Sequence, residues 1–543
     1  MGTLLLSNGK IVDGSGQDSF RGHVLIEGER IREICSQKVG IPAADEVIDV
    51  AGAAITPGFI DMHSHADWHL PDPDHPTLMK CLVEQGITTI IAGNCGISPA
   101  PYNAETFQYV ETLASILMDK PIDYQWQTMS EFLTCLEQFK PLVNIAELVG
   151  HAAVRIAYAG TRRGKMKAAE LSHCLAKTHE ALDQGACGIS FGLGYDPGMY
   201  SPLEELKAFC LVAQEAGKPV AVHLKAYSWL SPCYHSTTPQ AHNVKALQEM
   251  LNIVRQTGVK LQMSHFLFVG RKSWKYAART LQIIDRAVRD GLDVMIDAFP
   301  YTCGNTTILA TLPFWFLAGL PAAFKNRKAL LRLRVELELG FRLVGFRYHD
   351  FQVMATAVPG WEHLYGLTIP EIAQKWNTSS FQTLLKLSET SQGGALILFH
   401  TYSGDAENQK PLEAVLKHEQ CLFETDVALK SKAYPNPAGL GTYPKILGTY
   451  VRDQKLFTIE SAIKRMTSAS AERFGLTDRG LLAPGKFADV VVFDPDTIAE
   501  TPPVGPKPAS KPVGIKYVFI NGNRVVENGD YNVGERSGRV LRL

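Results

Sequence analysis

The sequence predicts an α/β protein in which a (β/α)8 TIM-like barrel is joined to a small β-sandwich built from both chain termini. Two observations lead to this fold class. Both ends of the chain alternate apolar and polar residues around tight-turn signals, as short antiparallel strands do. Between the ends, eight apolar, strand-like runs alternate with helical stretches, which is typical of parallel βαβ units. We expect residues 1–55 and 481–543 to form the sandwich and residues 56–480 the barrel.

The terminal segments carry hairpin signals. Asn8-Gly9 and Glu27-Gly28 interrupt the N-terminal alternation, and Asn521-Gly522 separates two β-rich runs at residues 517–520 and 524–526. Each end alone has too few strands to bury a sheet face. We therefore expect the two ends to pack together into one domain.

The barrel strands are expected at eight runs, which are residues 54–62, 88–93, 142–149, 186–191, 219–222, 259–264, 292–296 and 421–425. The gap between the last two runs is too long for one crossover, so residues 302–420 should hold an insertion. Part of it, residues 324–334, is basic and helical in character, and residues 395–399 form a further apolar run. This insertion either covers the substrate or only adds helical packing.

The composition excludes several classes of partner. Lysine and arginine total 54 against 55 for aspartate and glutamate, so no net field attracts nucleic acid or an anionic membrane. No apolar run reaches the length of a membrane span. The ten cysteines form no Cys-x-x-Cys pair, which fits a reducing cytoplasm. We expect a cytoplasmic protein that acts on a small molecule.

Metal-binding residue types stand at the ends of five of the eight runs. His63-Ser64-His65 closes the first run, and this spacing directs both imidazoles to one side of an extended backbone. The other donors at run ends are Cys95, His223, His265 and Asp426. The carboxyl ends of barrel strands meet at one rim, where such donors would form a metal centre. Each of them taken singly is more often a structural residue.

The segment Ala-Gly-Asn-Cys-Gly-Ile-Ser-Pro at residues 92–99, together with these donors, resembles the amidohydrolase superfamily and within it the D-aminoacylase group, the N-acyl-D-amino-acid deacylases. The similarity covers nearly the whole chain. Further family-like segments lie at residues 57–65, 149–151, 192–198, 297–301, 441–444 and 465–489.

The resemblance implies a zinc centre. Carried over by position, a tight site is held by Cys95, His223 and His265, and a second, weaker site is bordered by His63, His65, Cys95 and Asp426. In this group the cysteine thiolate takes the place of the carboxylated lysine that bridges two metals in many other amidohydrolases. A soft thiolate combined with imidazoles favours zinc.

The resemblance and the spacing also imply roles in catalysis and substrate binding. Asp426 is the expected general base and acid for cleavage of an amide, unless it serves as a helix N-cap. Lys225 lies two residues beyond His223, so it should point to the same side and bind a substrate carboxylate, although a solvated lysine is the alternative. Tyr195 and Tyr301 match family positions on the substrate side, and either would otherwise be a packed aromatic residue.

Three segments depart from the family pattern on the substrate side. The usual Ser-Asp-Gly is Thr425-Asp426-Val427, a basic residue after the sixth-strand histidine is replaced within Phe266-Leu267-Phe268, and His-Pro-Arg is Tyr434-Pro435-Asn436. The sequence thus predicts zinc-dependent hydrolysis of a linear amide, foremost of an N-acyl-D-amino acid. The alternatives are a cyclic amide hydrolase of the hydantoinase or dihydroorotase kind and a non-catalytic scaffold.

Overall fold

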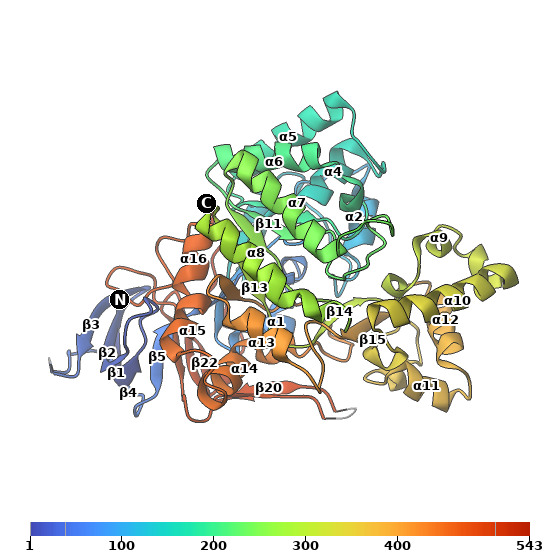
Figure 1. Cartoon of the computed structure of the whole chain (residues 1–543). Helices are drawn as coiled ribbons and strands as arrows, with labels where there is room; N and C mark the ends of the chain where they lie inside the picture. Colours follow the sequence, from blue (N-terminus) through green and yellow to red (C-terminus); the bar gives the residue numbers. More distant parts are fainter. Residues whose placement is uncertain (1, 39, 505–506) are drawn as a thin grey trace.

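The computed structural model describes residues 2–38, 40–504 and 507–543. The chain forms a barrel, a sheet shared by the two termini on one side of it, and an insertion that projects on the other side (Figure 1).

The predicted runs form short parallel strands, namely β6 (Phe59–Asp61), β7 (Ile87–Ala92), β8 (Asn144–Glu147) continued by β9 (Val149–Gly150), β10 (Ile189–Gly192), β11 (Val220–His223), β12 (Leu261–Met263), β13 (Val294–Ala298) and β17 (Cys421–Phe423). β6, β7 and β8 pair in this order, and β9 to β13 pair onward to β17. Just beyond β6 and β17, Ser64 and Val427 form a parallel bridge that joins the two edges. The predicted barrel is confirmed.

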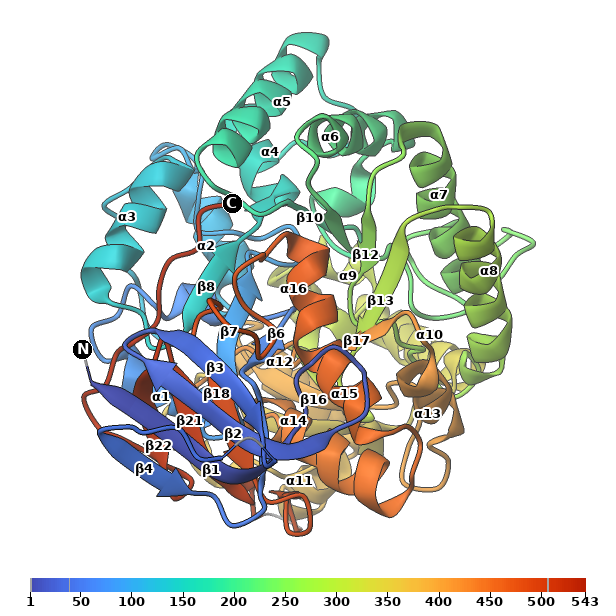
Figure 2. The same ribbon diagram turned by 90° about the vertical axis from the view of Figure 1, so that its left-hand side faces the viewer.

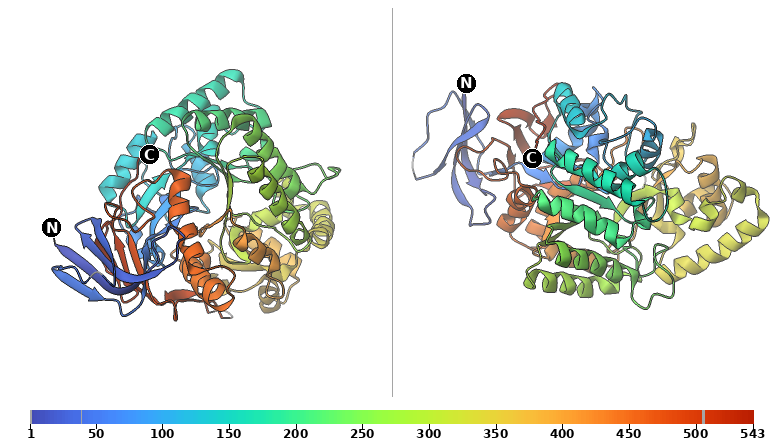
Figure 3. Two further views of the ribbon diagram at one scale, coloured as in Figure 1. Left: turned by 60° about the vertical axis from the view of Figure 1, so that its left-hand side comes forward. Right: turned by 90° about the horizontal axis from the view of Figure 1, so that it is seen from above.

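Helices surround the strands (Figure 3). They are α1 (His75–Val83), α2 (Phe107–Ala114), α3 (Met129–Phe139), α4 (His151–Ala159), α5 (Ala168–Asp183), α6 (Leu203–Glu215), α7 (His242–Thr257), α8 (Ala277–Arg289), α13 (Lys410–Lys417), α14 (Ala438–Lys445), the π-helical segment η8 (Ile446–Asp453), α15 (Ile459–Met466) and α16 (Ser468–Phe474). Within the described part of the chain, no helix combines the length and apolar character that a membrane crossing requires.

The interior of the barrel is packed with side chains from successive strands. Ile60, Ile91, Ala221 and Leu422 share one buried cluster with Phe474 of α16. Because strand side chains alternate between faces, these residues point inward while their neighbours pack against the helices. α16 lies across one end of the barrel, next to this cluster (Figure 2). The opposite end therefore remains for a functional site.

The terminal sheet interleaves strands from both ends of the chain, as predicted. Its order is β23-β22-β21-β18-β5-β1-β2-β3, with β4 paired to β1. The bounds are β1 (Thr3–Ile11), β2 (Phe20–Glu27), β3 (Arg30–Ser36), β4 (Glu46–Asp49), β5 (Ala54–Pro57), β18 (Val490–Phe493), β21 (Ile515–Ile520), β22 (Asn523–Glu527) and β23 (Asp530–Tyr531). A separate two-stranded ribbon, β19 (Ala499–Thr501) and β20 (Ser510–Val513), packs beside α14.

The insertion has a sheet and a hydrophobic core of its own. The central strand β16 (Leu396–His400) pairs antiparallel with β14 (Cys303–Thr307) and β15 (Phe351–Ala355). The helices are α9 (Phe314–Leu317), α10 (Arg327–Val344), α11 (Ile369–Lys375) and α12 (Ser380–Thr390). The basic helical run of the sequence thus begins at the end of a short 3-10 helix and continues into α10, while the apolar run at residues 395–399 is the middle strand.

We expect Phe474→Ala to lower the free energy of unfolding by about 3–5 kcal/mol, because the phenyl ring fills the end of the barrel and leaves a cavity when removed. Phe474 is 2% exposed, whereas Phe20 on β2 is 39% exposed, so Phe20→Ala serves as the matched control and should cost less than about 1 kcal/mol. Urea denaturation of both variants measures the difference. Equal losses of unfolding free energy in the two variants would contradict the packing of Phe474 from α16 into the end of the barrel.

Candidate metal centre and substrate cavity

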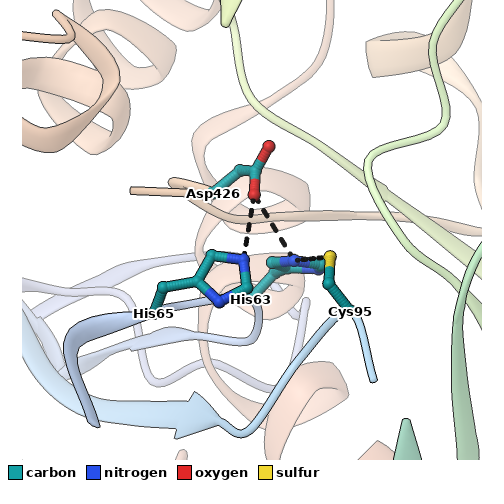
Figure 4. A group of neighbouring side chains, drawn as sticks. All are labelled: His63, His65, Cys95 and Asp426. Carbon is teal, nitrogen blue, oxygen red and sulfur yellow. Dashed lines mark hydrogen bonds and ion pairs between the residues drawn. The ribbon is translucent and has the colours of Figure 1, made fainter. Parts of the chain in front are cut away.

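The predicted donors converge at the carboxyl ends of the barrel strands. Their ligand atoms form two groups in which all atoms lie within 4.8 Å of one another. One group is His63, His65, Cys95 and Asp426, drawn in Figure 4, and the other is Cys95, His223 and His265. Cys95 belongs to both groups, so its sulfur stands between them.

The three-residue group has the dimensions of a zinc site. The Sγ atom of Cys95 lies 3.8 Å from Nδ1 of His223 and 3.5 Å from Nε2 of His265, and the two nitrogens are 3.0 Å apart. Ideal tetrahedral zinc, with Zn–S of about 2.3 Å and Zn–N of about 2.0–2.1 Å, separates sulfur from nitrogen by about 3.6 Å and two nitrogens by about 3.3 Å. The three ligand atoms therefore fit zinc.

The four-residue group surrounds the same sulfur from the other side. Nε2 of His63 lies 3.4 Å from the sulfur of Cys95 and 3.5 Å from Oδ1 of Asp426. Nε2 of His65 is also 3.5 Å from that oxygen. Figure 4 shows the carboxylate of Asp426 facing both imidazoles. This arrangement can hold a second cation.

Three of the candidate ligands have an uncommon backbone conformation. Cys95, His265 and Asp426 have φ angles of 56°, 32° and 46°, in the left-handed region that residues other than glycine rarely adopt. Such strain persists where the surrounding structure imposes it, and it concentrates at functional sites. In each case the strained residue lies in the loop after its strand, since β7 ends at Ala92, β12 at Met263 and β17 at Phe423, and the loop turns the side chain toward the cluster.

Two buried carboxylates, Asp61 and Asp297, hold these loops in place. Asp297 accepts hydrogen bonds from the backbone N–H of His265 and from Gln262, both at 2.6 Å. Asp61 accepts from the N–H of His63 at 3.3 Å and from the N–H and hydroxyl of Thr425 at 3.0 and 2.6 Å. Neither carboxylate is among the candidate site residues predicted from the sequence. The available signal was a carboxylate within an apolar strand, because buried acids are rare unless paired.

The electrostatics of the cluster favour a cation. Burial lowers the pKa of His63 and His223 well below their usual range, which leaves ring nitrogens with free lone pairs at neutral pH. Burial raises the pKa of the Cys95 thiol well above its usual range, and the charge of Asp426 adds to this shift. The thiol thus stays protonated unless a bound cation stabilises the thiolate.

Asp426 is poised as a base. Burial opposes its ionisation, but the imidazoles of His265, His65 and His63 outweigh that effect and lower its pKa to about 2. Its side chain is 24% exposed toward the cavity. An ionised carboxylate beside the candidate metal positions can therefore accept a proton from water.

Two of the three predicted substrate-side residues reach the cavity. Tyr195 and Lys225 line it. The hydroxyl of Tyr195 donates to the carbonyl oxygen of Cys95, and its ring lies 5.0 Å from that of His223. The Lys225 ammonium lies 5.3 Å from the ring of Tyr234. Tyr227, which the sequence analysis missed, packs its ring 5.0 Å from His223 and donates its hydroxyl to the carbonyl of Ser264.

Tyr301 lies elsewhere, contrary to the expectation that it binds substrate. Its hydroxyl donates to Glu500 at 2.7 Å, and the ammonium of Lys445 lies 4.1 Å from its ring centre. Glu500 belongs to β19, a ribbon that comes from the C-terminal part of the chain. This long-range contact draws the tyrosine away from the cavity into a structural role.

The cavity has a volume of about 1600 Å³ and joins the metal cluster to the insertion. His65, Cys95, His223, His265 and Asp426 all line it. One wall is Leu113, Ile116 and Leu117 near α2, and another is formed by the insertion. Leu267 also faces the cavity. It belongs to the segment Phe266-Leu267-Phe268, in which the basic residue of the family pattern is replaced.

The other altered segment, residues 434–436, connects the barrel to the insertion. The N–H of Tyr434 donates to the carbonyl oxygen of Met354 at 2.8 Å, and the side chain of Asn436 donates to that of Asn305 at 3.0 Å. These contacts secure β14 and β15 against the barrel. They thereby fix the wall that the insertion contributes to the cavity.

Comparison with known proteins agrees with this geometry. The amidohydrolase family model matches residues 46–315 and 405–526, which omits most of the insertion. An N-acyl-D-glutamate deacylase from Alcaligenes xylosoxydans xylosoxydans is 31% identical over 541 residues, covering 99% of this chain and 96% of the relative.

Two solved structures are similar over the full length. An N-acyl-D-glutamate deacylase from Bordetella bronchiseptica, complexed with zinc and a phosphonate that mimics the tetrahedral intermediate, has a TM-score of 0.80 and 28% identity, covering 99% of both chains. A D-aminoacylase studied for its binuclear metal centre has a TM-score of 0.79 and 29% identity, covering 100% of both chains.

We expect Cys95→Ser to lower zinc affinity by more than about 100-fold. Removing a residue that only orients a metal ligand costs roughly 10–100-fold, and Cys95 would itself be a ligand in both groups. Cys135→Ser on α3, remote from the cluster, is the control and should bind zinc as the unaltered protein does. Zinc content after dialysis against graded chelator, measured by mass spectrometry, provides the comparison. Unchanged affinity in Cys95→Ser would exclude the sulfur as a ligand.

Zinc affinity should rise about tenfold per pH unit between about pH 6 and 8. Binding displaces one proton from the Cys95 thiol, whose pKa is raised, while the imidazoles of His63 and His223 are already neutral. Competition titrations at several pH values give the slope. The slope should disappear in Cys95→Ser, and a pH-independent affinity in the unaltered protein would contradict this assignment.

Proposed function

This chain belongs to the amidohydrolase family and is a metal-dependent member of the N-acyl-D-amino-acid deacylase group, and we propose that it hydrolyses the linear amide bond of an N-acyl-D-amino acid. The products are a carboxylate and a D-amino acid. The observation that carries this proposal is the convergence of Cys95, His223, His265 and Asp426 on one cavity.

The ligand distances give two candidate metal sites. Carried over from the family resemblance, Cys95, His223 and His265 would hold the tighter zinc, and His63, His65, Cys95 and Asp426 would border a second, weaker site. Zinc bound there supplies a Lewis acid that lowers the pKa of a water to about 7 and polarises the substrate carbonyl. The zinc-containing deacylase structure supports this choice of metal.

Asp426 carries the proton in the reaction. Its ionised carboxylate accepts a proton from the attacking water as the oxygen bonds to the amide carbon. The same proton then passes to the amide nitrogen as the carbon–nitrogen bond breaks, so the leaving group departs as a neutral amine. The lowered pKa suits the first step, because the carboxylate is free of a proton at neutral pH.

Lys225 and Tyr195 position the substrate. Lys225 lines the cavity, and among the described residues it forms no ion pair, so its ammonium is available to bind the substrate carboxylate. Lysine binds as a point charge, so this contact fixes the carboxylate less strictly than an arginine fork. Tyr195 adds its ring to the wall beside His223 while its hydroxyl holds the Cys95 loop.

We expect Asp426→Asn to lower kcat for N-acyl-D-amino acids by about 10²–10⁴-fold, because the amide cannot accept the proton of water. Zinc at the site of Cys95, His223 and His265 should remain. Asp183→Asn, the same change at a side chain that is 68% exposed on α5, is the control. Undiminished turnover in Asp426→Asn would remove this residue from the mechanism.

The substrate panel should pair each N-acyl-D-amino acid with its L enantiomer and include hydantoins and dihydroorotate. Turnover of the D substrates supports the proposal. Hydrolysis confined to the cyclic amides would favour the alternative reaction, and an inert zinc-loaded protein would contradict both.

A further inference from the structure

The cavity extends beyond the metal cluster into the insertion, where it becomes an apolar groove. We call the part between α9 and α10 the insertion groove. Its walls are Leu312, Phe314, Leu317, Leu337, Phe341 and Val344. α9 and α10 lie side by side in Figure 1, and Trp315 of α9 donates its indole N–H to Glu336 of α10.

Two polar side chains at the groove, Glu336 and Thr311, are already paired within the protein. Glu336 accepts from Arg332 at 2.7 Å as well as from Trp315. The hydroxyl of Thr311 donates to the carbonyl of Ile308 at 2.7 Å. A polar ligand group entering here would lose its hydrogen bonds to water without full replacement, whereas an alkyl chain loses none. The groove therefore selects for apolar groups.

The size of the cavity indicates a large substrate. Its volume of about 1600 Å³ exceeds the roughly 300–1000 Å³ of ordinary small-molecule sites. The groove is continuous with the metal cluster, so one ligand can react at the cluster and occupy the groove. The side chains of the common amino acids are too short to extend along the whole groove, whereas the length of an acyl chain is not restricted in this way. The acyl chain is therefore the part of the substrate that can fill the groove.

Resting on the proposed function, we propose that the substrate carries a long linear acyl chain and that the insertion groove binds it. The amide carbonyl lies at the metal cluster, the amino-acid carboxylate at Lys225, and the alkyl chain runs toward α9 and α10. The insertion is then a specificity element that selects long-chain N-acyl amino acids over N-acetyl ones.

A series of acyl lengths on one D-amino acid tests the proposal. The value of kcat/KM should rise about fourfold for each added methylene from acetyl through hexanoyl to decanoyl, because each buried methylene contributes a constant increment of transfer free energy. It should level off when the groove is full. A flat or falling series would overturn the proposal. Absence of turnover for every acyl length would instead contradict the proposed function.

A second series distinguishes the acyl chain from the amino-acid side chain. It keeps the acetyl group and lengthens the side chain from alanine through norleucine to 2-aminodecanoic acid. Only a small rise is expected in this series. A steep rise here and none in the acyl series would place the side chain in the groove and overturn the proposal.

Gly340 allows the groove to be filled without disturbing its surroundings. It lies within α10, lines the cavity, and a Cβ added to it meets nothing within 4 Å. Gly340→Trp should therefore lower kcat/KM for the decanoyl substrate by on the order of 100-fold and leave the acetyl substrate unchanged. Gly340→Ala and Leu339→Trp are the controls, since alanine is small and Leu339, 57% exposed, points outward.

Binding supplies a readout that does not depend on turnover. Calorimetric titration with decanoate, the product of the decanoyl substrate, should show binding to the unaltered protein and weaker binding to Gly340→Trp, with acetate binding unchanged. Equal decanoate binding in both proteins would overturn the proposal. If Gly340→Trp also lost zinc or thermal stability together with acetyl turnover, a blocked groove would not be the cause of its lower kcat/KM for the decanoyl substrate.

Discussion

Closure of the barrel is the constraint on which the site depends. The N–H of Asp426 donates to the carbonyl oxygen of His63 at 3.0 Å, and Ser64 and Val427 form the bridge beside it. These contacts join the first and last strands, which hundreds of residues separate along the chain. Because parallel strands present all their carboxyl ends on one rim, a single closed ring brings donors from five strands into two adjoining ligand groups that share Cys95.

Donor proximity is achieved at a local cost. The backbones of Cys95, His265 and Asp426 occupy the left-handed region, and two buried carboxylates, Asp61 and Asp297, hold the loops that contain the ligands. A buried thiol beside a carboxylate is unfavourable to ionise, and a divalent cation relieves this directly. A cation bound by these ligands would offset this cost.

The metal side and the substrate side of the cavity have separate origins. The rim of the barrel provides the ligands and the base, whereas the outer wall comes from the insertion, whose core is independent of the barrel. Residues 434–436 tie the two together through Met354 and Asn305. The sequence departs from the family pattern at Leu267 and at residues 434–436, which changes the cavity wall and leaves the candidate ligands unchanged. Substrate preference can therefore diverge while the metal-binding residues stay the same.

The sequence by itself predicted the eight barrel strands, the joining of both termini and six candidate donors whose side chains the structure brings together. Periodicity sets which face a strand buries, and barrel topology sets where strands end. The sequence also predicted that Tyr195 and Lys225 face the substrate side, where the structure places both on the cavity wall. Only the tertiary structure decided the position of Tyr301, whose hydroxyl donates to Glu500 of the β19–β20 ribbon. It also decided that Asp61 and Asp297 hold the loops that contain the candidate ligands. The shape of the insertion groove was likewise settled in three dimensions. Side chains at strand ends are directed by contacts between segments far apart in the chain, and no local pattern encodes those contacts.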